Sequence, residues 1–143
     1  MAYSDIINKE ATERGIWNAL LAIQDQASEL VPVDKGQLRN SISIATNMRA
    51  GEFNKYGGES APSSARITPP REDYTGVVGS ALVYAMAQEY GLPERGLPAQ
   101  PYMRPAARLM WAKITGFYTI AIKDEIKELA QKQLAKRQSR GIQ

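Results

Sequence analysis

The sequence predicts a single α+β domain, with a long helix at each end packed on a small antiparallel sheet. Near both ends of the chain, apolar residues recur at three- and four-residue steps, which is the periodicity of a half-buried helix. Between these regions, one short run alternates Ile42 and Ile44 with polar residues, as a strand with one buried face does, and a second run over residues 74–83 is rich in strand-forming residues. The 143 residues fit one domain that buries roughly two thirds of its unfolded surface.

The first helix is expected over residues 5–31. Ser4 or Asp5 can cap its start, and Gly15 costs on the order of 1 kcal/mol relative to alanine. Pro32 cannot continue an α-helix, so the chain turns there. The apolar positions that share the buried face are Ile6, Ile7, Ala11, Trp17, Leu20, Leu21, Ala27 and Val31.

Two strands are expected in the middle of the chain. Asp34 and Gln37 resemble a capping box that opens a short helical turn and places Leu38 inward. The first strand follows at 41–47 and the second at 75–84, paired antiparallel. Residues 48–74, rich in Gly, Pro and basic residues, are expected to form an extended arm between the two strands.

The last helix is expected over residues 104–137, followed by a basic tail. Gly91 closes a helical turn at 85–90 in a left-handed cap, and the prolines at 93–101 predict a stiff, extended loop. Pro105 suits the first helical position. Thirty helical residues span roughly 45 Å, which exceeds a domain of this size. The distal half is therefore expected to pack on something outside the protomer.

Composition argues against an enzyme. The chain has no Cys and no His, which removes thiolate metal sites and the commonest general base. No metal site, cofactor, signal peptide or membrane span is predicted, and the protein is expected to be soluble and made in a cytoplasm. Charge is uneven: the net charge of +3 divides into +6 from Arg104 onward and −3 before it.

Three sets of residues could carry chemistry or binding. Glu89 could act as an acid or base, but we expect it to satisfy a loop N–H or an arginine such as Arg39. Trp111 is expected in the core, with an interface role left open. The basic residues Lys132, Lys136, Arg137 and Arg140, with Arg66 and Arg71, could contact DNA phosphates, although a solvated or acid-paired helix end is the simpler explanation.

Three short motifs follow one another in a fixed order. They are Val31-Pro-Val-Asp-Lys-Gly-Gln-Leu-Arg-Asn-Ser-Ile42, Tyr84-Ala-Met-Ala-Gln-Glu-Tyr-Gly91 and Ala99-Gln-Pro-Tyr-Met-Arg-Pro-Ala106. Together with the elements between them, over residues 5–125, they resemble the neck and tail-completion family of lambda-like, long-tailed bacteriophages. Lys35 stands where Thr is common in that family, and Tyr90 where Phe is common.

The resemblance implies a structural virion protein without enzymatic activity. Copies would form a homo-oligomeric ring, a hexamer or dodecamer, around the DNA channel at the head-tail junction and join tail to head. Its partners would be head-closure or adaptor proteins, the tail terminator and, non-specifically, packaged DNA. The alternative function is sequence-independent nucleic-acid binding through the basic C-terminal helix. Candidate assembly residues are Arg39, Arg66, Arg71, Glu89, Tyr90, Tyr102, Arg104, Leu129 and Leu134, and Lys132, Lys136, Arg137 and Arg140 are candidate DNA-facing residues.

Overall fold

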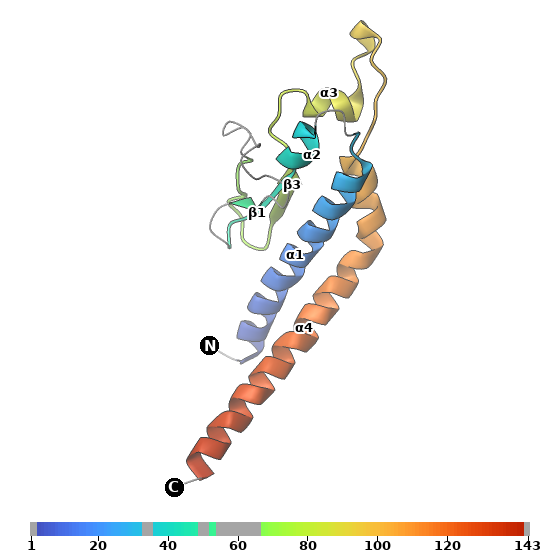
Figure 1. The fold of residues 1–143 in the computed structure, drawn as a ribbon. Helices are drawn as coiled ribbons and strands as arrows, with labels where there is room; N and C mark the ends of the chain where they lie inside the picture. Colours follow the sequence, from blue (N-terminus) through green and yellow to red (C-terminus); the bar gives the residue numbers. More distant parts are fainter. Residues whose placement is uncertain (1–2, 33–35, 49–51, 54–66, 142–143) are drawn as a thin grey trace.

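Two long antiparallel helices dominate the fold, and a small sheet lies against the first of them (Figure 1). The structure is a computed structural model that describes residues 3–32, 36–48, 52–53 and 67–141. Helix α1 spans Tyr3–Leu30 and helix α4 spans Met103–Gly141. The α+β class predicted from the sequence is confirmed. Helix α4 begins one residue earlier than expected and ends four residues later, so the expected basic tail is largely helical.

The sheet has three strands in the order β2-β1-β3, all antiparallel. Strand β1 spans Ser43–Thr46, β2 Glu52–Phe53 and β3 Gly76–Gly79. Strand β2 falls inside the expected 48–74 arm, so the prediction of an arm without a strand is wrong there. Both β1 and β3 are shorter than the expected 41–47 and 75–84, since helix α2 (Gln37–Ser41) precedes β1 and Ser80 begins a turn.

Helix α1 packs against both the sheet and α4, and two glycines allow the close approach. A Cβ at Gly15 would lie 3.1 Å from Cα of Tyr118 on α4. A Cβ at Gly76, on β3, would lie 2.5 Å from Cδ1 of Leu20 on α1. Gly15 lowers the stability of α1 as an isolated helix, but it lets the two long helices pack closely. Gly76 allows the close approach of β3 to α1, a role that glycine often has in strands.

The main core lies where the C-terminal end of α1 meets α2, α3 (Ala85–Tyr90) and the start of α4. Ile42 is fully buried there, and Leu38 points inward as expected. Gln24 of α1 is also fully buried and donates from Nε2 to the Ile42 carbonyl at 2.9 Å. The buried apolar members of this core are Ile23, Ala27, Val31, Leu38, Ile42, Ala85, Tyr102, Ala106 and Met110.

The proline-rich loop after α3 folds back on itself and is not extended as expected. Leu92 and Leu97 form a β-bridge, with N–H to carbonyl distances of 2.9 and 3.1 Å, around the short 3₁₀ helix η2 (Pro93–Arg95). Gly91 precedes it with a φ of 78°, and a Cβ there would lie 2.7 Å from the Ala99 nitrogen. Glycine is needed at this position both for the positive φ and for the close approach.

Helix α4 extends well past α1 (Figure 1). Its 39 residues span about 58 Å, against about 42 Å for the 28 residues of α1. Every residue from Ala130 to Gly141 is exposed. This stretch is therefore left uncovered by its own chain, and its packing on something outside the protomer stays a prediction. In the described part of the chain, no helix is both long enough and apolar enough to cross a membrane.

Candidate assembly site

The three sequence motifs meet at one place in the fold. The Tyr84 hydroxyl, before α3, donates to Oε1 of Gln37 on α2 at 3.3 Å. Gln88 of α3 and Gln100, in the segment leading to α4, are joined by a side-chain hydrogen bond of 2.8 Å and a backbone hydrogen bond of 2.9 Å. These side chains border a pocket of about 470 Å³ that Pro32, Gly36 and Leu38 complete. Segments far apart in sequence thus build one joint, which we call the motif joint.

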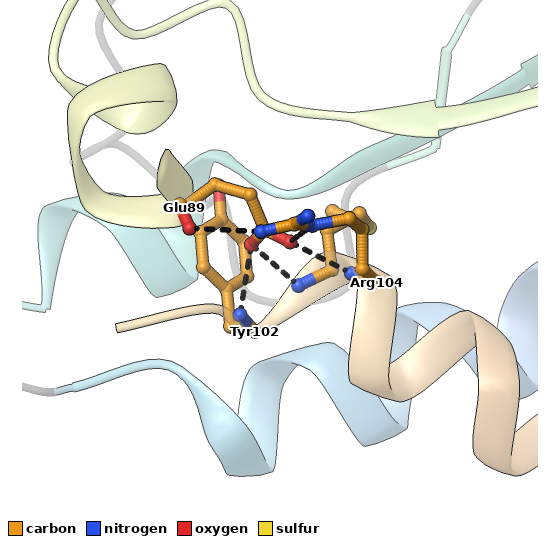
Figure 2. A network of polar contacts seen from close by, with 4 residues as sticks. Glu89, Tyr102 and Arg104 are labelled. Carbon is orange, nitrogen blue, oxygen red and sulfur yellow. Dashed lines mark hydrogen bonds and ion pairs between the residues drawn. The ribbon is translucent and has the colours of Figure 1, made fainter. Parts of the chain in front are cut away.

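Glu89 joins the second motif to the third (Figure 2). Its Oε2 accepts the N–H groups of Tyr102 at 2.8 Å and Met103 at 3.0 Å. Its Oε1 accepts the backbone N–H of Arg104 at 2.9 Å and the guanidinium Nε–H of the same residue at 3.0 Å. The expectation that Glu89 satisfies loop N–H groups and an arginine is confirmed, with Arg104 in the place proposed for Arg39.

The Glu89 carboxylate accepts hydrogen bonds from the first backbone N–H groups of α4. The first N–H groups of an α-helix have no partner within the helix and must be satisfied elsewhere. Glu89 accepts those of Met103 and Arg104, and Pro105 has no N–H to satisfy. Ala106 then makes the first intrahelical bond, to the Tyr102 carbonyl at 3.2 Å. Pro105 is therefore the third helical residue and not the first, because the cap comes from a different element.

The charge of Glu89 is held by these donors. Burial alone would raise the pKa of the Glu89 carboxyl, but the N–H groups of Met103, Tyr102 and Arg104 and the Arg104 guanidinium outweigh burial, so the pKa lies below its ordinary value of 4.5. The positive end of the α4 dipole favours the same charged state. Because both carboxylate oxygens accept hydrogen bonds and the lowered pKa keeps the group ionised, Glu89 is poorly suited to acid-base chemistry.

Tyr102 closes the joint from the core side. Its side chain is buried against the main core. Burial, followed by the charge of Glu89 and the neighbouring Tyr84, raises the pKa of the Tyr102 phenol to about 12. Although both were predicted as assembly residues, Glu89 and Tyr102 are buried in the chain's own fold, where they fix the start of α4 and do not present a contact surface.

Arg104 and Tyr90 form the exposed face of the joint. The Arg104 Cζ lies 4.5 Å from the centroid of the Tyr90 ring, a cation-π distance. Tyr90 is 57% exposed, and the Arg104 side chain is 48% exposed. The buried Glu89 carboxylate orients the Arg104 guanidinium through a hydrogen bond. The two candidate assembly residues, Tyr90 and Arg104, are therefore held in one geometry and remain accessible to a partner.

The other predicted residues lie apart from the joint. Arg39 is half-buried on α2, and Arg71 is exposed before β3. Leu129 is half-buried on α4 and Leu134 is 58% exposed. The four basic residues expected to face DNA are all exposed on the overhanging end of α4: Lys132, Lys136, Arg137 and Arg140. Arg66 and Asp34 lie outside the described residues.

Several exposed apolar side chains were missed by the sequence analysis. Val83 is 97% exposed, Met86 72% and Leu97 53%, all around α3 and its loop. Trp111 on α4 is 76% exposed, so its expected place in the core is wrong for the isolated chain. Helical periodicity groups residues on a face but does not reveal whether that face is covered. We call Val83, Met86, Tyr90 and Leu97, the exposed apolar residues of α3 and of the segments beside it in the sequence, the α3 group.

Among the described residues, no cluster of Asp and Glu side chains is arranged to hold a metal ion. Comparison of the chain with protein-family models, with curated proteins and with solved structures finds no match in any of the three.

Proposed function

We propose that this protein is a non-enzymatic structural subunit of a phage virion, located at the head-tail junction, where copies form a ring around the DNA channel and join tail to head. Its further partners would be the head-closure or adaptor protein and the tail terminator. The resemblance of the three motifs to the neck and tail-completion family suggests this role. One structural observation supports it most: all three motifs converge on a single joint that fixes the long helix α4.

The uncovered apolar surface supports assembly with other copies. The α3 group and Trp111 lie on different elements, and we infer that they contact different neighbours, so that each chain has two unlike contact surfaces. Contacts between unlike surfaces of identical subunits are head-to-tail and close into a ring when the rotation between subunits permits. Large exposed apolar side chains such as Met86 and Trp111 are the kind of anchor that dominates protein interfaces.

The test is the mass of the protein in solution by light scattering, with variants on each surface. Met86→Asp and Trp111→Asp should each shift assemblies toward monomers while leaving the circular dichroism spectrum unchanged. Thr119→Asp, at another exposed position on α4, is the matched control and should assemble like the wild type. Wild-type protein that stays monomeric, or variants that assemble as well as the wild type, would reject the proposal.

A second candidate function is sequence-independent nucleic-acid binding by the end of α4. From Leu129 to Gly141 the chain has four basic residues and no acidic ones, and the stretch from Ala130 onward is exposed. Such a patch binds phosphates with an affinity that falls as salt rises, with a log-log slope of about −0.9 per phosphate contacted. Fluorescence anisotropy with duplex DNA across salt concentrations measures this slope. Replacing Lys132, Lys136, Arg137 and Arg140 by Gln should abolish binding if this function is correct.

A further inference from the structure

A buried carboxyl lies between the two long helices, far along α4 from the motif joint. The Glu125 side chain is fully buried, and it is the last buried residue of α4 in the described chain. Arg14 of α1 places Nη2 at 3.3 Å from Glu125 Oε2 and Nη1 at 3.4 Å from Glu128 Oε1. One guanidinium is therefore shared between two carboxyl groups of α4.

The surroundings of Glu125 do not satisfy a full negative charge. Among the described residues, no N–H donor reaches either Glu125 oxygen in hydrogen-bonding geometry. Glu10, one helical turn before Arg14 on α1, is exposed itself, and its carboxyl interacts with that of Glu125. Three ionised carboxylates around one arginine would leave two uncompensated charges, one of them buried. A buried carboxyl in this position lowers its free energy by keeping a proton.

We propose that Glu125 keeps its proton in the folded chain and donates it in a hydrogen bond to Glu10, which forms a proton-controlled clasp between α1 and α4. The proton lets one carboxyl donate to the other, which joins the helices across their interface. When the proton leaves, the like charges repel and the contact at this level weakens. The next buried residue of α4 is Ala121, so release of the clasp lengthens the free distal part of α4 by one helical turn.

The electrostatic environment gives the direction of the pH dependence. The hydrogen bond with Glu10, then burial and the charges of Glu10 and Glu128, raise the pKa of Glu125, while Arg14 lowers it; the net result lies above the ordinary value of 4.5. Lys9 and Glu13 of α1 border a separate hollow with Asp73. Because the folded chain holds the proton more tightly than the unfolded chain, the stabilisation from Glu125 is fully present at pH values below its ordinary pKa. This stabilisation is lost as the pH rises through the raised pKa of Glu125 in the folded chain.

Unfolding by urea, followed by circular dichroism from about pH 5 to about pH 8, tests the clasp on the full chain. Each unit by which the pKa is raised should lower the wild-type folding equilibrium constant by about tenfold across that interval. Glu125→Gln imitates the protonated side chain and should remove this loss, as should Glu10→Gln. The matched control Glu128→Gln, whose side chain is 48% exposed, should keep most of it.

Carboxyl ¹³C NMR of wild-type protein gives a readout that does not depend on any variant folding well. A glutamate carboxyl that titrates above the ordinary range supports the clasp, and the absence of its signal in the Glu125→Gln spectrum identifies it. The proposal is overturned if every glutamate titrates in the ordinary range. It is equally overturned if Glu125→Gln shows the same pH-dependent loss as the wild type.

Discussion

Replacing Glu89 by glutamine tests how the motif joint holds helix α4. The side chain keeps its volume, but an amide NH₂ takes the place of one carboxylate oxygen and faces N–H donors. If it replaces Oε1, the Arg104 N–H loses its acceptor, which costs about 1–3 kcal/mol for a buried donor. The two hydrogen bonds from Tyr102 and Met103 become neutral, at a cost of about 1 kcal/mol for the pair or more. The half-exposed Arg104 side chain adds under about 1 kcal/mol.

The expected loss is therefore about 3 kcal/mol, which corresponds to a fall in Tm of roughly 6–12 °C for a chain of this size. Urea unfolding at neutral pH measures it, with the exposed Glu94→Gln as the control that should stay within about 0.5 kcal/mol of wild type. A Glu89→Gln variant as stable as this control would refute the reasoning.

The same variant carries a pH signature. Because the pKa of Glu89 is lowered on folding, its stabilisation is present above the ordinary value of 4.5 and is lost as pH falls through the lowered value. The difference in stability between wild type and Glu89→Gln should therefore shrink in acid. This is the opposite direction to the one expected for Glu125. A difference that is constant with pH would mean that charge has no part in the cap.

Three further predictions follow from burial and close contacts. Gly76→Ala should destabilise the fold by about 1–3 kcal/mol, since its Cβ would meet Leu20, whereas Gly79→Ala, with open space around it, serves as the control in the same unfolding assay. Removing residues 130–141 should leave the free energy of unfolding within about 0.5 kcal/mol of wild type. In a spectrophotometric titration, the Tyr102 phenol should ionise near pH 12, and Tyr102→Phe should remove that step.

The long helices and the pairing of β1 with β3 could be predicted from the sequence, while strand β2 could not. The two long helices follow from repeated apolar steps, and Gly91 follows from the turn that it closes. Strand β2, only Glu52–Phe53, has no alternation of its own to detect. It forms because the edge of β1 offers unpaired backbone groups, and that edge is created by the tertiary fold.

The candidate site shows the same division. Sequence reasoning assigned Glu89 to a loop N–H or an arginine such as Arg39, in preference to acid-base chemistry. It could not identify Tyr102, Met103 and Arg104 as those donors, since 13–15 residues and a folded-back loop separate them. The exposure of Trp111 was missed for a related reason: the apolar period of α4 continues past the surface that α1 covers.

The central claim, that the chain completes its packing only in a ring of copies, is tested most directly by imaging the purified protein by negative-stain electron microscopy. The account predicts rings with an open centre, of six or twelve chains of 15.8 kDa each, that disappear in Trp111→Asp. Fields of single, rod-shaped particles at every concentration that the protein tolerates would contradict it.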